Sequence, residues 1–266
     1  MKHGEKGAVH LRTFTHEGLK ELFEYHGFKV EKMKIKWRMD DITWNRINNC
    51  LDYGYIDFFN ECESKDSEYI LDWGGGDGMS KRLKKNSTKI VVNIDPDFNS
   101  LKSNPDWSMV VSGIGQKLPF KGQMFAGVHI RASLHHAYHD LDACLDEIYR
   151  VLSNGGVVFI QEPLNANPLS RISRKIFPTD KHNLDEKPLN PKKLLNCLSP
   201  NFEIKLIKFQ FLTSYLFPHI ICRVPIKPIW RVIAFSLLRI DKWLLKNCRF
   251  MRLYAEYITV IGVKRQ

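Results

Sequence analysis

A glycine-rich turn directly after an apolar run constrains the fold of this chain more than any other feature. The run Tyr69-Ile70-Leu71-Asp72-Trp73 leads into Gly74-Gly75-Gly76-Asp77-Gly78, and residues 79–85 have the composition of a helix. Glycine has no Cβ atom, so this turn can adopt positive φ and let a ligand approach its backbone closely. A strand, a glycine turn and a helix in this order open a nucleotide-binding α/β unit. The alternative for the turn alone is an ordinary tight connection.

A carboxylate at the end of the next predicted strand supports the nucleotide reading. Residues 89–94 are mostly apolar and β-branched, and Asp95 follows them, 17 residues after Gly78. In a doubly wound sheet this position lies beside the glycine turn, where a carboxylate can accept both hydroxyls of a ribose. The spacing is close to the roughly 20 residues expected. The alternative is that Asp95-Pro96-Asp97 forms only a turn.

The remaining apolar patterns predict an alternation of strands and helices. Residues 141–152 form an amphipathic helix with one apolar face. Gln161-Glu162-Pro163 then ends a strand at the expected substrate-facing rim. The further predicted strands are 108–112, 124–130, 157–160, 202–212 and 255–263.

Four segments in the same order resemble the class I S-adenosylmethionine (SAM) methyltransferases, in particular the type 11 domain shared with quinone-biosynthesis enzymes. Asp72 to Gly78 resembles the motif D-x-G-x-G-x-G, and Leu118-Pro119-Phe120 resembles the L-P-F that follows the third strand. Ala132 to His136 resembles S/N-x-L-H-H, and residues 147–160 resemble E-I-x-R-V-L-x-x-G-G-x-x-x-I. The resemblance covers residues 66–162, about 100 of 266.

This resemblance implies a fold, a cofactor and a set of contacts. The fold is α/β, with a doubly wound, Rossmann-like, seven-stranded sheet whose last strand is antiparallel. We expect a helical N-terminal cap over 1–65, a SAM-binding core over 66–162, and a substrate and cap region over 163–266 that completes the sheet. The implied cofactor is SAM, and the implied cofactor-binding residues are Asp72, Gly74, Gly75, Gly76, Gly78, Asp95, Pro96, Ile114 and Arg131.

Two positions depart from the family pattern. Many members carry an acid near Ile114 that meets the adenine amino group, and an isoleucine side chain cannot accept that bond. Losing one hydrogen bond costs about 1 kcal/mol. The acid that often opens the fourth strand is Ala126 here. These departures keep open an alternative, a methyltransferase fold that no longer turns over and acts as a scaffold or membrane-surface protein.

Histidines are the candidate general bases for a hydroxyl, phenol or acidic carbon acceptor, because their pKa lies near neutral pH. We expect His129 to face a covering helix or the sheet. His135 and His136 follow the fourth strand, beside the position of the methyl group in this fold, and His136 is the preferred base or orienting residue. His139 and His182 are the other candidates. The six cysteines are scattered without a C-x-x-C pair, so no metal site is expected.

The positive charge is concentrated in the C-terminal part. Residues 165–266 hold 19 Lys and Arg against six Asp and Glu, within a chain of net charge +11. Residues 228–247 read as one helix on which Arg231, Arg239, Lys242 and Lys246 share a narrow stripe. One interpretation is a helix that is buried on most sides and has a single solvent-exposed edge. The other is an interfacial helix at an anionic membrane.

The sequence therefore predicts a SAM-dependent methyltransferase acting on a small or lipid-linked acceptor, with O- or C-methylation favoured. The expected location is cytoplasmic, with peripheral contact to the inner membrane face as an open alternative, since no apolar signal core or run of 18 apolar residues is present. RNA methylation is a further alternative. It suits the charge, but no N-P-P-Y-like or P-C segment follows the fourth strand.

Overall fold

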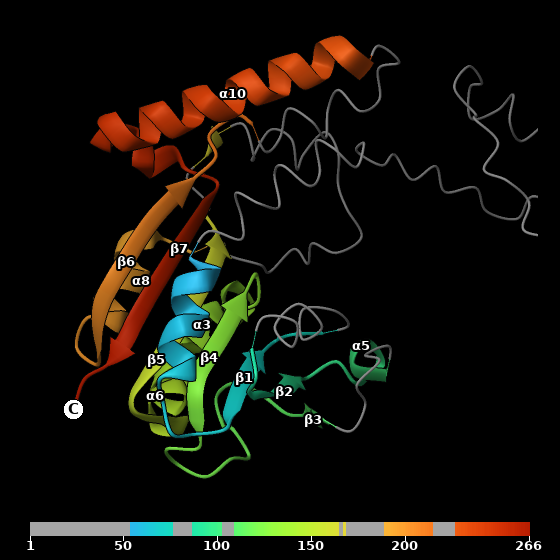
Figure 1. The fold of residues 1–266 in the computed structure, drawn as a ribbon, viewed down its shortest axis with the longest axis vertical. Coiled ribbons are helices and arrows are strands. Elements are labelled where there is room, and N and C mark those ends of the chain that lie inside the picture. The colour runs from blue at the N-terminus through green and yellow to red at the C-terminus, as the bar shows by residue number, and fades with distance from the viewer. Residues whose placement is uncertain (1–53, 77–86, 103–108, 165–166, 169–188, 215–226) are drawn as a thin grey trace, which may run out of the picture.

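The structure is a computed structural model that describes residues 54–76, 87–102, 109–164, 167–168, 189–214 and 227–266. Within these ranges a single seven-stranded sheet forms, in the order β3-β2-β1-β4-β5-β7-β6 (Figure 1). Its strands are β1 (Tyr69–Trp73), β2 (Ile90–Asp95), β3 (Val110–Ser112), β4 (Phe125–Arg131), β5 (Leu152–Pro163), β6 (Phe202–Gln210) and β7 (Tyr257–Lys264).

The first five strands are parallel, and β7 runs antiparallel between β5 and β6. The expected doubly wound sheet with an antiparallel last strand is therefore confirmed. Strand β5 begins at Leu152, earlier than the predicted 157–160, because Leu152 already has an extended backbone and pairs with Phe125. Strands β1, β2, β4 and β5 are mostly buried, as the inner strands of such sheets are, whereas β3 at the edge is only partly buried.

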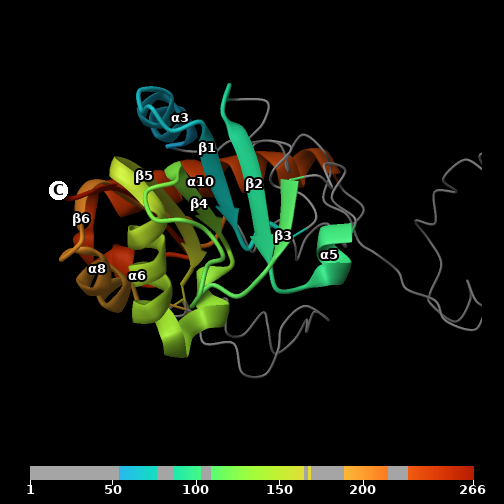
Figure 2. The same ribbon diagram turned by 90° about the horizontal axis from the view of Figure 1, so that it is seen from below.

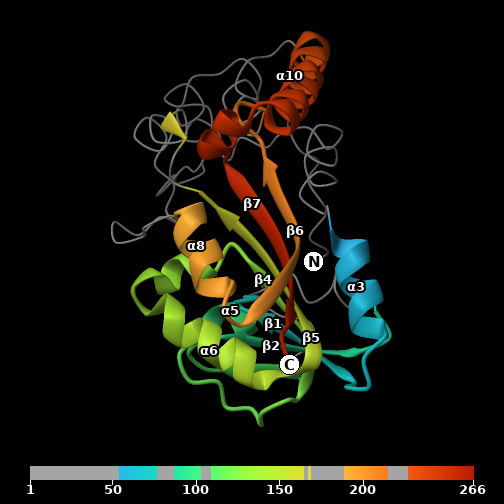
Figure 3. The same ribbon diagram turned by 90° about the vertical axis from the view of Figure 1, so that its left-hand side faces the viewer.

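Helices cover both faces of the sheet. On one face, α3 (Tyr55–Glu63) packs Phe58, Phe59 and Cys62 against the centre of the sheet. On the other, α6 (Leu141–Val151) and α8 (Pro191–Leu198) bury their apolar faces against the larger core cluster. Figures 2 and 3 show α3 on the side opposite α6 and α8. The remaining described helices are α5 (Phe98–Lys102), η2 (Leu134–Asp140), α10 (Lys227–Asn247) and η3 (Arg249–Tyr254).

The helix predicted at 79–85 and most of the cap predicted at 1–65 lie outside the described residues, apart from α3. The predicted helix 228–247 corresponds to α10, which lies beyond the carboxyl ends of the parallel strands (Figure 1). Within the described residues, none of the helices combines the length and the apolar character that crossing a bilayer requires.

Candidate functional site

The glycine turn closes tightly against two neighbouring strands. The Gly74 N–H donates to the Ile94 carbonyl at 2.8 Å. Gly74 and Gly76 have φ of 67° and 51°, in the left-handed region that favours glycine. A Cβ on Gly74 would also lie 2.4 Å from the Ser133 Cβ. The backbone of the turn is therefore fixed by both conformation and space, and no side chain larger than hydrogen fits at Gly74.

Two side chains from β2 hold the far end of this turn. The Gly76 N–H donates to Asp95 Oδ2 at 3.1 Å, and Asn93 Nδ2 donates to the Gly76 carbonyl at 2.9 Å. Asp95 Oδ1 accepts from the Asp97 N–H at 2.8 Å. A carboxylate offers about four lone-pair sites, so partly exposed Asp95 keeps capacity for two further donors. The sequence placed Asp95 beside the turn, whereas the role of Asn93 was missed.

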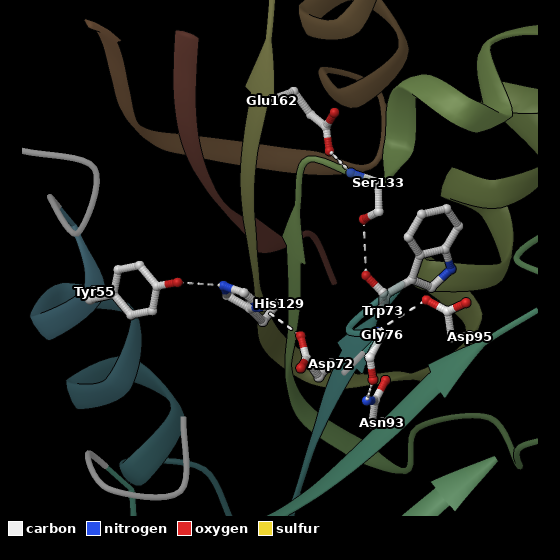
Figure 4. A network of polar contacts seen from close by, with 9 residues as sticks. All are labelled: Tyr55, Asp72, Trp73, Gly76, Asn93, Asp95, His129, Ser133 and Glu162. Carbon is white, nitrogen blue, oxygen red and sulfur yellow. Dashed lines mark hydrogen bonds and ion pairs between the residues drawn. The ribbon is translucent and has the colours of Figure 1, made fainter. Parts of the chain in front are cut away.

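Asp72 lies beneath the turn in a buried polar relay. Its Oδ1 lies 2.8 Å from His129 Nδ1, and His129 Nε2 lies 2.8 Å from the Tyr55 hydroxyl (Figure 4). Asp72 is 1% exposed and His129 is 0% exposed. Asp72 Oδ2 has no hydrogen-bond partner in the described part of the chain, and a Cβ on Gly75 would meet it at 2.3 Å. This burial places the carboxylate as a support under the turn.

The same hydrogen bonds account for the orientation of the buried His129 ring. Its ring stacks on Phe159 with centroids 5.3 Å apart and an interplanar angle of 14°. The sequence expectation that His129 faces a covering helix agrees with its bond to Tyr55 of α3. A fully buried ring with both nitrogens engaged cannot reach an acceptor, so His129 is excluded as the base.

Glu162, at the end of β5, organises the turn that follows β4. Its Oε1 accepts from the N–H groups of Ser133 and Leu134 at 2.9 and 2.8 Å, and its Oε2 accepts from the His135 N–H at 3.3 Å. The Ser133 hydroxyl then donates to the Trp73 carbonyl at 3.0 Å, which ties this turn to the glycine turn (Figure 4). The sequence placed Glu162 at the rim but assigned it no role. An acid at the end of an apolar strand was the available signal.

The adjacent histidines differ in burial. His135 is buried, and its Nδ1 lies 2.8 Å from Glu162 Oε2. His136 is exposed, and its ring centroid lies 4.2 Å from that of His135. His139 is also exposed. His182 lies outside the described residues.

The remaining predicted contacts lie around the ends of β2, β3 and β4. Pro96 is exposed directly after β2, and Ile114 is 55% exposed after β3. Arg131 is the last, partly exposed residue of β4. Gly78 lies outside the described residues. Within the described ranges no group of three or more His, Cys, Asp or Glu side chains is placed to hold a metal ion.

Comparison with known proteins identifies the domain that contains this turn. Residues 71–160 match the family described as "Methyltransferase domain". This span runs from β1 to β5 and includes the glycine turn, Asp95 and the segment after β4.

Residues 71–160 form a methyltransferase domain.

Curated relatives match a similar length of the chain. A demethylmenaquinone methyltransferase from Streptomyces avermitilis is 33% identical over 103 residues, and one from Streptomyces griseus is 31% identical over 103 residues. Each match covers 38% of this chain and 44% of the relative, less than half of either. The chain therefore spans less than half the length of these relatives.

Solved structures share the fold over more of the chain. A SAM-dependent methyltransferase from Archaeoglobus fulgidus has a TM-score of 0.55 at 21% identity, covering 82% of this chain and 94% of that one. The [4+2]-cyclase SpnF has a TM-score of 0.55 at 14% identity, covering 94% and 96%. A fold of this kind hosts more than one reaction, so the function of the methyltransferase domain has to be argued from its site.

Proposed function

We propose that this protein is a SAM-dependent methyltransferase acting on a small or lipid-linked acceptor, with oxygen or carbon as the methylated atom. One observation carries the proposal. Within the methyltransferase domain, the fixed glycine turn and the Asp95 carboxylate meet at the carboxyl ends of β1 and β2. Ligands of doubly wound sheets bind in the crevice at this edge.

The residues present fit SAM. The glycine turn gives a backbone surface for close approach, and Asp95 keeps lone pairs for two ribose hydroxyls. Exposed Pro96 and Ile114 offer apolar contact to the adenine side, together with Phe98 of α5. Asp72 contributes as the support beneath Gly75, and Arg131 lies at the rim. Bound SAM supplies a methyl group on a sulfonium, which an acceptor attacks in line.

The protein's part in the transfer is alignment and removal of one proton. Alignment of the reacting atoms to about 3 Å supplies much of the rate. For an acceptor that carries a proton on its nucleophilic atom, we propose that His136 takes this proton or orients the acceptor. Its exposed ring follows β4 at the same edge as the glycine turn. His135, held by Glu162, positions the neighbouring ring.

Calorimetric titration with S-adenosylhomocysteine (SAH) tests the cofactor site. We expect micromolar binding by the intact protein and weaker binding by Asp95→Ala, by about 10- to 100-fold, because two charge-assisted hydrogen bonds are lost. Asp146→Ala, an exposed acid on α6, is the matched control and should bind as the intact protein does. No binding by the intact protein would instead favour the non-catalytic scaffold, which the missing acid at Ile114 already suggests.

Methyl transfer to demethylmenaquinone, the acceptor in the relatives' name, is the first turnover assay. Where that acceptor is methylated, His136→Ala should lose about 100-fold or more in turnover, as removal of a general base does, with SAH binding retained. His139→Ala changes the other exposed candidate histidine on the same 3-10 helix, and we expect a smaller loss of turnover there than in His136→Ala. Full turnover by both His135→Ala and His136→Ala would contradict a role for either ring.

A further inference from the structure

The helix α10 has two faces of different character. Ala234, Leu238, Asp241 and Leu245 are buried, and at 3.6 residues per turn they share one stripe. On the opposite side Val232 is 66% exposed and Trp243 is 64% exposed. The side of α10 opposite the buried stripe is therefore exposed to solvent. This contradicts the interpretation of a helix that is buried on most sides.

A single buried carboxylate fixes the rotation of this helix. Asp241 Oδ2 accepts from the N–H groups of Leu212, Thr213 and Ser214 at 2.8, 3.0 and 2.9 Å, and from the Ser214 hydroxyl at 2.6 Å. These residues follow the end of β6 directly. Because the Asp241 side chain cannot turn outward without losing these bonds, the exposed face of α10 is set by the fold.

That exposed face combines cations with large apolar side chains. Arg239, Lys242 and Lys246 on α10 are exposed, as is Arg249 at the start of η3. Between and beside them lie exposed apolar side chains: Val232, Ile240, Trp243, Phe250 and Leu253. Asp241 is the only acid in the sequence from 227 to 254, and it is buried. The surface is thus positive, apolar and without an exposed counter-charge of its own. We call these nine residues the α10 surface.

The α10 surface lies at the same edge of the sheet as the cofactor site. Strand β6 is parallel to β1–β5, since both β5 and β6 are antiparallel to β7. Its carboxyl end, which carries the Asp241 cage, therefore lies at the edge where the glycine turn and Asp95 are found. Figure 3 shows α10 and η3 together beyond this edge.

We propose that the α10 surface docks on an anionic lipid bilayer, so that the edge of the sheet that carries the cofactor site faces the membrane and the acceptor is a lipid-linked molecule. An interfacial helix places basic side chains among headgroups and Trp, Phe and Leu at the acyl boundary. Basic residues near such a surface are attracted by its negative potential. The docking itself rests on the α10 surface alone, whereas the acceptor class rests also on the proposed function.

An anionic bilayer fits this surface better than a nucleic acid does. Binding to a phosphate backbone is supplied by Lys and Arg contacts, which leaves exposed Val232, Ile240 and Leu253 without a role. A bilayer uses both parts, because the cations meet headgroups and the apolar side chains enter the boundary below them.

Vesicle sedimentation tests the proposal with the full chain. The probes are vesicles of phosphatidylcholine alone and of phosphatidylcholine mixed with phosphatidylglycerol. The charge variant replaces Arg239, Lys242, Lys246 and Arg249 together by Gln. The matched control replaces four exposed cations outside α10 and η3 by Gln: Lys121, Lys192, Lys205 and Arg265.

We expect the intact protein and the control to sediment with the anionic vesicles, less so as salt rises. The charge variant should lose more than about 100-fold in affinity, at about five-fold for each cation. Trp243→Ser should weaken binding and leave a larger share of it salt-sensitive, since only the apolar part is removed. Circular dichroism establishes that each variant is folded.

Two results would overturn the proposal. One is no sedimentation of the intact protein, or equal loss in the charge variant and the control. The other is binding of a labelled RNA oligonucleotide through the same four cations without vesicle binding. SAH titration of the same samples separates the proposals. Vesicle binding without SAH binding overturns the proposed function, and the acceptor class with it, and leaves the docking standing. SAH binding without vesicle binding overturns the docking and leaves the cofactor site standing.

Discussion

At the residue scale, Glu162 joins elements that are distant in the sequence. It is fully buried, and it accepts hydrogen bonds from three consecutive N–H groups after β4 besides contacting the His135 ring. Ala132, just before these groups, has φ of 50°, which is uncommon for a residue with a Cβ. A carboxylate with several backbone donors is thus what holds this turn in position against the glycine turn.

Replacing Glu162 by Gln should destabilise the fold. The amide keeps one acceptor oxygen, loses the charge that strengthens the bonds, and turns an NH2 group toward backbone donors. We expect the free energy of unfolding to fall by roughly 1–3 kcal/mol, measured by urea titration. Glu203→Gln, which changes an exposed acid paired with Lys205, should change it little. Equal small effects from both would show that the buried carboxylate contributes nothing beyond a surface one.

At the scale of elements, the close packing of α3 against the sheet depends on a glycine, which has no side chain. Gly127 lies in β4, and a Cβ there would come within 2.3 Å of Cys62 Sγ and 3.0 Å of the Phe58 ring. The close approach of α3 brings Tyr55 onto His129 and so completes the relay beneath the glycine turn. Burial raises the pKa of the Cys62 thiol well above its ordinary range, so this thiol should react slowly with alkylating agents in the native protein.

Gly127→Ala should lift α3 from the sheet. Overpacking of this kind costs about 1–3 kcal/mol, and we expect a lower midpoint of urea unfolding with faster alkylation of Cys62, followed by peptide mass spectrometry. Gly122→Ala is the control, because its Cβ would meet only the Arg150 carbonyl at an ordinary 3.4 Å and the side chain of the same residue at 4.0 Å. Unchanged Cys62 reactivity in Gly127→Ala would mean that α3 does not depend on this contact.

At the scale of the whole molecule, the C-terminal part completes the sheet and adds α10 at the edge that holds the site. Strands β6 and β7 come from the predicted region 163–266, and β7 pairs with β5 of the methyltransferase domain along seven residues of each strand. The core and the C-terminal region therefore share one sheet. The buried Asp241 cage fixes which face of α10 points outward, and with it the direction in which the proposed membrane surface faces.

The sequence by itself determined the alternation of strands and helices, the glycine turn, the position of Asp95 and the extent of α10. Each rests on local chemistry: apolar runs, glycines where the backbone needs positive φ, and an acid at a strand end. Even so, β5 began earlier than predicted, because pairing of Leu152 with Phe125 depends on the neighbouring strand.

Only the tertiary structure decided what the buried polar groups do. Asp72 and His129 are separated by 57 residues, Ser133 and Glu162 by 29, and Ser214 and Asp241 by 27. Nothing in the local pattern of either partner specifies the other, because such pairs form when separate strands and helices pack and each buried polar group must find a partner. The sequence therefore predicted the fold and the cofactor edge, while packing determined their polar supports and the outward face of α10.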